Sequence, residues 1–293
     1  MGEKVLGCDC SFWQGEMDWQ MAKDNGIFFA FLRSSFGNHE TDRQIVRNWQ
    51  ETKRVGIPRG AYHFLLSYQS VDSQVKKFLA PLGGDYGELP LVCDIEKWRS
   101  RDGVYESYPG LSMIEKFCKS VEDKTGHPTI IYSSPGYWNY LTGVKNATWA
   151  LDRIPWVAHY TTNATPQILY PWDNWKFWQY TAGGDGYKYG TDFGSKAIDL
   201  NYYNGTMEQF VKEFKLEGHE EIPDDPNAKK YVKTKDNLRG RAKPVYVYGD
   251  SALIFKQGQL LEVANAPEVY EEASDITWMP IIMYVSKKWV REV

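Results

Sequence analysis

Hydrophobic positions in the first part of the chain follow two alternating patterns. Short runs rich in β-branched and aromatic residues predict buried strands, and the stretches between them carry apolar residues at the spacing of amphipathic helices. Eight strands are predicted in this way, at Val5–Cys10, Ile27–Arg33, Gly60–Leu65, Leu89–Glu96, Thr129–Ser133, Pro155–Tyr160, Lys176–Tyr180 and Ala197–Asn201.

The clearest helical stretch has its apolar stripe over 111–121 and is stopped by Gly126, and two others are centred on 45–49 and 71–79. Because such stretches separate the first five strands, the sequence predicts a parallel sheet that closes into a barrel. The last three strands lie too close together for full helices between them. We therefore predict an α/β fold, an incomplete TIM-like (β/α) barrel of eight strands and about five helices.

Beyond the barrel the pattern changes. A last helix over 207–214 is followed by a polar stretch with two prolines and no periodicity at 218–229, which is typical of a linker. Short β segments over 230–293 predict a small all-β barrel. We therefore divide the chain into a large domain of residues 1–217, a linker of residues 218–229 and a small domain of residues 230–293.

Composition narrows the classes of function. The 293 residues are 42% hydrophobic and 25% charged with a net charge of −4, which excludes wholesale disorder and predicts no membrane insertion. Neither the large nor the small domain is strongly basic, so a nucleic-acid partner is disfavoured. The aromatic content of 15% is high, and aromatic faces bind flat ligands such as sugar rings.

The cysteines and the start of the chain bear on its location. Four cysteines, two of them separated by a single residue, are too few and too close for a disulfide scaffold, and we expect them to be reduced. The first ten residues contain no apolar stretch of signal-peptide length. We therefore expect the protein to be synthesised in the cytoplasm without a signal peptide. We also expect it to be a monomer.

Acidic residues end several of the predicted strands. Asp94 and Glu96 are two residues apart and, because side chains alternate across a strand, they share one face. Asp9 lies in the first strand and Asp199 in the eighth. Barrel enzymes keep their active sites at the carboxyl ends of the strands, so the four acids are predicted to converge on one cavity there.

Four carboxylates in one cavity favour acid–base chemistry. Their burial is costly, and the strand motifs contain no Arg or Lys to pair with them. Clustered carboxylates separate one another's pKa values, so that Glu96 can stay protonated while its neighbours are ionised, as glycoside hydrolysis requires. A divalent cation is the alternative use. No His lies beside Asp94 and Glu96, which leaves open only an oxygen-ligated magnesium or calcium site. We predict no metal and no cofactor.

Aromatic and amide side chains end the other strands. Polar-tipped rings suit a carbohydrate, whose apolar faces stack on them while its hydroxyls take hydrogen bonds. The predicted substrate-binding residues are Tyr62, Phe64, Tyr132, Tyr160, Trp178 and Gln179.

Taken together, these motifs resemble glycoside hydrolase family 25, the lysozymes of phages, bacteria and some fungi, over roughly residues 4–215. The segments that carry the resemblance are Gly7–Gly15, Gly60–Phe64, Asp94–Glu96, Trp178–Thr181 and Asp199–Asn201. The cysteines on either side of Asp9 depart from the family pattern, and their outward orientation should leave catalysis undisturbed.

The resemblance implies an N-acetylmuramidase that cuts the β-1,4 bond between N-acetylmuramic acid and N-acetylglucosamine in bacterial peptidoglycan. It implies Glu96 as the general acid, with Asp9, Asp94 and Asp199 completing the acidic site. We expect the substrate's own acetamido oxygen to attack the anomeric carbon while Asp94 orients the acetamido N–H.

The C-terminal domain resembles a bacterial SH3-like cell-wall-binding module at Asn237–Arg239, Lys256–Leu260 and Lys288–Val290. A wall substrate without a signal peptide is expected of a phage endolysin, which acts on the wall after release from the cytoplasm. A cysteine or zinc peptidase is disfavoured because the chain has neither a His-Glu-x-x-His nor a Cys-x-x-Cys motif. A non-catalytic sugar-binding protein on the same barrel is the alternative.

Overall fold

The computed structural model describes residues 4–143, 147–192 and 196–216, and beyond them only short backbone strands. The chain divides into two compact units, Met1–Glu220 and Glu221–Val293. The predicted linker, and most of the predicted small barrel, lie outside the described residues. The short strands of the second unit pair as β12 (Lys230–Lys233) with β15 (Leu260–Val263), β13 (Tyr246–Val247) with β14 (Ser251–Ala252), and β16 (Val269–Glu271) with β17 (Ile276–Trp278).

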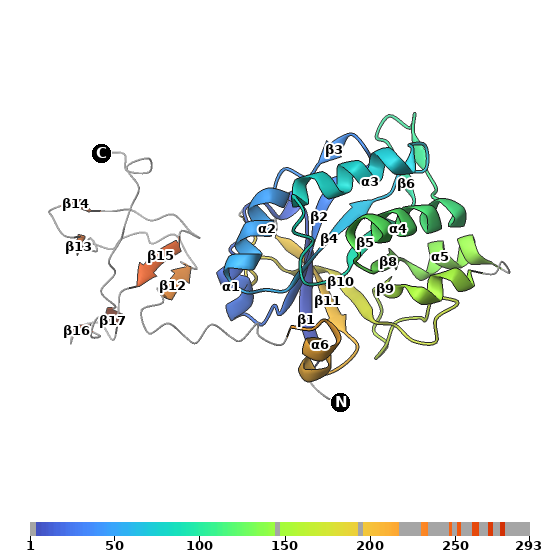
Figure 1. Ribbon diagram of the computed structural model, residues 1–293. Coiled ribbons are helices and arrows are strands. Elements are labelled where there is room, and N and C mark those ends of the chain that lie inside the picture. Colours follow the sequence, from blue (N-terminus) through green and yellow to red (C-terminus); the bar gives the residue numbers. More distant parts are fainter. Residues whose placement is uncertain are drawn as a thin grey trace. The chain divides into compact units, whose positions relative to one another are not determined.

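The first unit is built on a closed barrel of eight strands, as predicted (Figure 1). Strand β1 pairs with β2 on one side and with β11 on the other, and these two pairings close the ring. The strands of the ring are β1 (Val5–Cys10), β2 (Phe29–Phe36), β4 (Arg59–Phe64), β5 (Leu91–Ile95), β8 (Thr129–Ser133), β9 (Ile154–Ala158), β10 (Phe177–Asp185) and β11 (Ala197–Tyr203). The short strand β3 (Glu40–Thr41) pairs with β2 outside the ring.

One strand runs against the predicted direction. Strand β11 is antiparallel to both of its neighbours, β10 and β1, so the prediction of a wholly parallel sheet is wrong there. The connection between β10 and β11 spans only residues 186–196, which is too short for a helical crossover, and the chain returns directly as an antiparallel strand. The start of β11 therefore lies at the same mouth of the barrel as the ends of the parallel strands.

Helices cover the outside of the parallel strands (Figure 1). Five follow successive strands, as predicted, and a sixth follows β11, so the described residues contain six α-helices. They are α1 (Trp19–Asp24), α2 (Ile45–Arg54), α3 (Val71–Leu79), α4 (Leu111–Thr125), α5 (Pro135–Thr142) and α6 (Met207–Glu213). Short 3-10 helices occupy Phe12–Gln14, Ala80–Leu82 and Thr148–Asp152. No helix among the described residues is long and apolar enough to cross a membrane.

Local signals account for where these helices begin and end. Ser70 and Ser134 accept hydrogen bonds from the backbone N–H groups of the first turns of α3 and α5. Thr206 and Gln209 form a capping box at the start of α6, the predicted last helix. Gly126 ends α4 at a φ of 71°, which a residue with a side chain rarely adopts.

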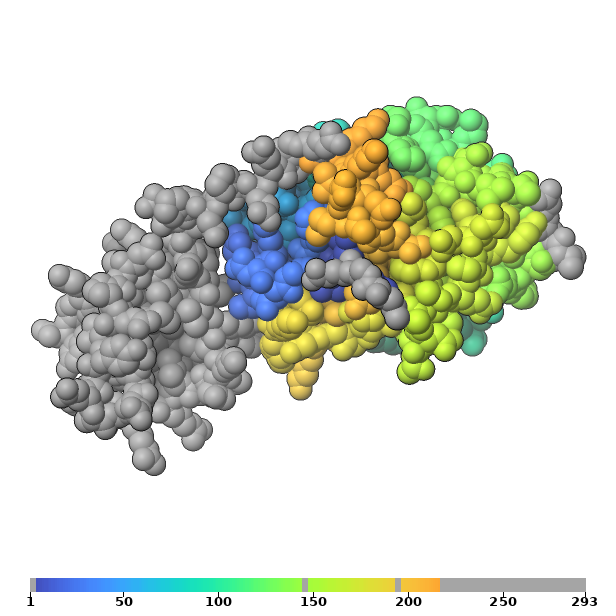
Figure 2. Space-filling model, turned by 90° about the horizontal axis from the view of Figure 1, so that it is seen from below, coloured from blue at the N-terminus to red at the C-terminus, as the bar shows by residue number. Residues whose placement is uncertain are grey.

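Alternation along the strands divides the interior into two cores. Outward-facing residues such as Leu32 and Ile95 pack against the helices, and this outer core also holds the four cysteines, which are free and buried. Inward-facing residues such as Phe31 and Phe177 fill the lumen. At the end opposite the mouth, Phe210 of α6 packs on Phe29 and Phe177 and covers that end of the lumen. Figure 2 shows the segment that contains α6 in orange on the surface seen from below.

Candidate active site

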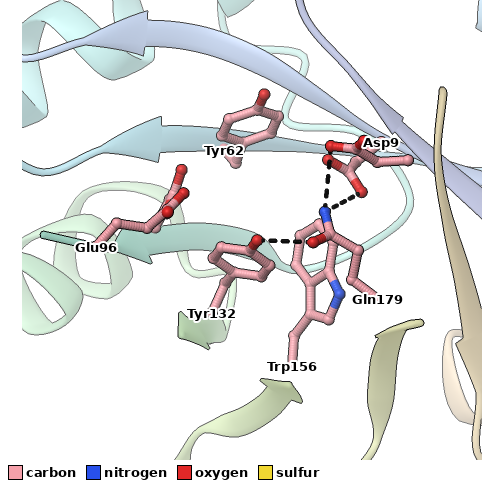
Figure 3. Close-up of a pocket in the computed structure, with 8 residues that line it drawn as sticks. Asp9, Tyr62, Glu96, Tyr132, Trp156 and Gln179 are labelled. Carbon is pink, nitrogen blue, oxygen red and sulfur yellow. Dashed lines mark hydrogen bonds between the residues drawn. The ribbon is translucent and has the colours of Figure 1, made fainter. Parts of the chain in front are cut away.

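A pocket with an empty volume of about 320 Å³ lies at the mouth of the barrel (Figure 3). The floor of the lumen is aromatic and apolar, whereas this end is lined mainly by polar side chains. The lining residues are Asp9, Tyr62, Asp94, Glu96, Tyr132, Trp156, Gln179 and Asp199.

The structure brings all four predicted acids to this pocket. Asp9 of β1 lies directly opposite Asp199 of β11 in the antiparallel pair, while Asp94 belongs to β5 and Glu96 follows the end of that strand. Asp9 and Asp94 are buried, Asp199 is half-buried and Glu96 is exposed at the rim. The four groups therefore form two pairs, one on β5 and one across β1 and β11.

In the first pair, burial raises the pKa of Asp94 well above its usual value, and the negative charges of Glu96 and Asp9 raise it further. The Arg33 guanidinium opposes this rise. Loss of water around the Glu96 carboxyl, followed by the charge of Asp9, raises the pKa of Glu96 as well. The interaction between the two carboxyls raises the pKa of Asp94 further and partly offsets the rise for Glu96. The pair therefore holds a proton where an isolated Asp or Glu would have lost it.

In the second pair, burial and then the charge of Asp9 raise the pKa of Asp199 to about 8. Asp9 is held differently, because its Oδ2 accepts hydrogen bonds from Asn201 Nδ2 at 2.8 Å and from Gln179 Nε2 at 2.9 Å. Burial raises the pKa of Asp9, and these amide donors counteract the rise by favouring the carboxylate. Asp199 therefore keeps its proton near neutral pH, while the amide donors favour the carboxylate form of its partner Asp9.

Gln179 connects the acids to the aromatic side of the pocket (Figure 3). Its Oε1 accepts hydrogen bonds from the hydroxyls of Tyr132 at 2.9 Å and Tyr160 at 2.7 Å, which directs its amino group toward Asp9. Three of the predicted substrate-binding residues, Tyr62, Tyr132 and Gln179, thus line the pocket. Tyr160 is exposed beside it and reaches it through its hydroxyl.

Two other predicted substrate-binding residues do not line the pocket. Phe64 stacks on Phe36 with ring centroids 4.7 Å apart, beyond the pocket. Trp178 lies in the outer core, where its Nε1 donates to the carbonyl of His159 at 2.7 Å. Because Gln179 points into the lumen, its neighbour Trp178 must point outward.

Three residues that serve the site were not predicted. Trp156 lines the pocket and donates from Nε1 to Asn201 Oδ1 at 2.8 Å, and Asn201 in turn donates to Asp9. Arg33 forms a 2.8 Å ion pair with Asp42 and is the positive charge that acts on Asp94. Alternation alone could have found Asn201, since it lies two residues after Asp199 in the same strand and shares its face.

The arrangement suits proton transfer next to a developing positive charge. Protonated and ionised carboxyls lie together, and the polar rings around them can hold hydroxyl groups. Within 4–143, 147–192 and 196–216, no group of three His, Cys, Asp or Glu side chains is placed to hold a metal ion.

Comparison with known proteins adds an independent observation. Residues 8–187 match the family model described as "Glycosyl hydrolases family 25". Lysozyme M1 of Streptomyces globisporus is 32% identical over 217 residues, which cover 71% of this chain and 70% of that protein. The YegX protein of Escherichia coli strain CFT073 is 31% identical over 215 residues, covering 70% and 71%. The crystal structure of a bacterial lysozyme from Streptomyces coelicolor superposes with a TM-score of 0.60 at 26% identity, over 72% of this chain and 97% of that one.

Proposed function

The chain belongs to glycosyl hydrolases family 25 and is a lysozyme-type muramidase that acts on peptidoglycan, and we propose that Glu96 is its general acid. The bond cleaved in this proposal is the β-1,4 link between N-acetylmuramic acid and N-acetylglucosamine. The observation that carries the proposal is the convergence of four carboxyls from three strands on one pocket, with pKa values that burial and mutual repulsion raise.

Glu96 is suited to the role of proton donor for two reasons. It is exposed at the rim of the pocket, where a glycosidic oxygen can reach it, and its pKa is raised. As the bond breaks, positive charge develops on the sugar ring. The carboxylate of Asp9, fixed by two amide donors, supplies compensating negative charge.

Asp94 has the features needed to orient the acetamido group of the substrate. It is only 5% exposed, and its Oδ1 has no hydrogen-bond partner. A buried acceptor without a donor is costly, and an acetamido N–H would supply one. In our proposal Asp94 accepts this N–H while the acetamido oxygen attacks the anomeric carbon and the glycosidic oxygen leaves with the proton of Glu96. Water then attacks the anomeric carbon and gives a proton to the Glu96 carboxylate, while the bond to the acetamido oxygen breaks. No covalent bond to the enzyme forms.

Mass spectrometry of digested peptidoglycan tests the bond. Fragments that end in reducing muramic acid are expected, and their release should fail with the Glu96→Gln variant. Reducing glucosamine would reassign the enzyme as a glucosaminidase. Binding of the glycan without any release, by the unmodified chain, would instead indicate a sugar-binding protein.

Trapping experiments test the role of Asp94. With a substrate analogue whose leaving group departs quickly, the unmodified chain should yield no covalent glycosyl-enzyme. A sugar ester on Asp94 or Asp199, found by peptide mass spectrometry, would contradict substrate assistance.

We further propose that residues 230–293 form an SH3-like module that binds the cell wall. A weak wall binder joined to the hydrolase would raise the local concentration of substrate. Removal of residues 224–293 should weaken sedimentation with whole cell walls and leave hydrolysis of short soluble fragments unchanged. Equal sedimentation of both forms would contradict the targeting role.

We also propose a phage endolysin role, in which the enzyme is made in the cytoplasm and reaches the wall after release. The peptidoglycan substrate lies outside the cytoplasmic membrane, so release has to precede action. Cells that produce the protein should lyse only once the membrane is permeabilised. Lysis without permeabilisation would contradict this role.

A further inference from the structure

An exposed aromatic cluster lies next to the candidate active site and outside the pocket. Strands β6 (Trp98–Arg99) and β7 (Glu106–Ser107) form a hairpin that begins two residues after Glu96. The rings of Tyr68 and Tyr105 stack with centroids 5.3 Å apart and an interplanar angle of 28°. Trp98 lies 6.5 Å from Tyr68, at 32° to it. We call these three residues, Tyr68, Trp98 and Tyr105, the aromatic platform.

The platform is connected to the barrel mouth by further rings. Trp98 packs edge-on against Phe36 at 5.2 Å, and Phe36 stacks on Phe64, the last residue of β4. Phe64 lies two residues after Tyr62, which lines the pocket. Ring contacts therefore link the hairpin to the end of β4, the strand that carries Tyr62.

Hydrogen bonds fix the hairpin in this position. The backbone N–H of Ser67 donates to Ser107 Oγ at 2.9 Å, and the N–H of Tyr108 donates to Ser67 Oγ at 3.0 Å. Within the hairpin, Arg99 pairs with Glu106 at 3.1 Å. The platform is thus held before any ligand arrives, which reduces the entropy cost of binding.

The two tyrosines of the platform are not explained by packing. Tyr68 is 42% exposed and Tyr105 is 53% exposed, so much of their aromatic surface faces water. Exposed aromatic surface gathered in one patch is typical of a binding site. Stacked tyrosines with free edges offer flat apolar faces together with hydroxyls, which matches a pyranose ring with its apolar face and its rim of hydroxyls.

We propose that the aromatic platform is a second sugar-binding site, which holds the glycan strand of peptidoglycan beyond the pocket. This inference rests on the proposed function. A strand that is cut at Glu96 has to continue past the pocket, and the hairpin that leaves β5 directly after Glu96 lies in reach of it. The occupant is therefore the substrate polymer itself and not a separate partner.

Binding measurements on the full chain carrying Glu96→Gln, which should bind without turnover, test the platform. The probes are long glycan strands freed of their peptides and a single disaccharide unit. Adding Tyr105→Ala should weaken binding of the long strands by roughly fivefold to tenfold, as expected for the loss of one stacked ring. Binding of the disaccharide should not change.

Two variants of the same hairpin serve as controls. Tyr105→Phe keeps the ring and should keep most of the affinity. Val104→Ala trims a neighbouring side chain that is 68% exposed and should leave the affinity unchanged. Near-ultraviolet circular dichroism checks that each variant is folded, and Tyr68→Ala provides a second test of the platform.

The outcomes separate this proposal from the proposed function. Unchanged affinity for long strands in both folded variants, Tyr105→Ala and Tyr68→Ala, would overturn the platform. An equal loss of affinity for the disaccharide would also overturn it, because the rings would then belong to the pocket. Failure of the proposed function would appear instead as the absence of muramic acid reducing ends from the unmodified chain, whatever residue stands at position 105.

Discussion

The two carboxyl pairs of the pocket are built in opposite ways. Asp9 and Asp199 face each other across antiparallel strands, and Asp9 is fixed by the side-chain amides of Asn201 and Gln179. Asp94 and Glu96 leave the same strand two residues apart, and no side-chain amide donates to either of them among the hydrogen bonds of the described residues. One Asp94 oxygen has no partner at all.

This difference separates two tasks that a glycosidase has to combine. A fixed negative charge needs rigid donors around it, since preorganised groups stabilise a transition state without reorganising. A proton donor and a substrate-orienting group need free lone pairs and access to the ligand. We therefore interpret the pair on β1 and β11 as the fixed charge and the pair on β5 as the reactive one.

The largest effect is expected from Glu96→Gln. The amide keeps the shape of the side chain but has no acidic proton, so kcat on peptidoglycan should fall by at least about a hundredfold. The melting temperature should stay the same or rise, because a carboxyl among like charges is removed. Reducing-end release and thermal unfolding check both points. A loss below about tenfold would remove Glu96 from the role of general acid.

The raised pKa of the Glu96 carboxyl also predicts how the activity depends on pH on the alkaline side. Glu96 can donate only while it is protonated, and its raised pKa extends that form to higher pH. Activity should therefore fall as the pH rises through the raised value, and the position of this fall should lie above that of an ordinary Glu.

Asp94→Asn and Asp9→Asn compare the two pairs directly. Asp94→Asn should lower kcat by about tenfold to a hundredfold, because a charge next to the reacting group is lost, and should leave the melting temperature nearly unchanged. Asp9→Asn should lower both activity and stability. The neutral amide oxygen would accept from Asn201 and Gln179 more weakly than the carboxylate does, because hydrogen bonds to a charged acceptor are worth about 1.5–3 kcal/mol and neutral ones about 1 kcal/mol.

Kinetics and denaturant unfolding of the two variants provide the measurement. Equal destabilisation by both substitutions would contradict the comparison, because it would mean that the reactive pair is held as firmly as the fixed one.

Much of the fold could be predicted from the sequence because strand positions depend on local patterns. The alternation of apolar and acidic residues placed Asp9 and Asp94 on the lumen side and the cysteines on the helix side, and the structure agrees. The direction of β11 could not be read in this way. An apolar run has the same pattern in both directions, and only the length of the connection distinguishes a crossover from a return.

The site residues could be predicted only in part, again because local patterns do not determine long-range contacts. Trp178 and Gln179 were both predicted to bind substrate, although adjacent residues of one strand face opposite sides and only one of them can reach the pocket. The sequence does not show which one does. Trp156 supports the site through Asn201, and Arg33 acts on Asp94. Both partners lie on other strands far along the chain, so no local pattern reveals these roles.

A smaller effect is expected from Asp199→Asn, and it concerns stability. The carboxyl has its ordinary pKa of 3.8 when unfolded and about 8 when folded. Below the lower value both states are protonated. Between the two values the unfolded state loses its proton first, so this group makes the native protein less stable as the pH rises.

An Asn at position 199 does not titrate, and its amino group can donate to Asp9 as the protonated carboxyl does. The melting temperature of Asp199→Asn relative to the unmodified chain should therefore rise between about pH 4 and about pH 8. Calorimetry at both ends of this range provides the measurement. A difference that is constant with pH would show that Asp199 is not the protonated member of the fixed pair.

The smallest effect on activity is expected from Trp178→Phe, with Trp156→Phe as its matched control. Trp178 contacts the outer core, donates to the carbonyl of His159 and lies 5.1 Å from the Lys4 ammonium, so its loss should cost about 1 kcal/mol of stability. KM and kcat should stay within about twofold, because a side chain on the far side of β10 cannot touch the sugar. Trp156→Phe removes the donor that holds Asn201 against Asp9, and it should lower kcat through the fixed pair. If Trp178→Phe raised KM more than Trp156→Phe did, the outer side of β10 would have to contact the substrate. Our placement of substrate binding at the pocket with the two carboxyl pairs would then be wrong.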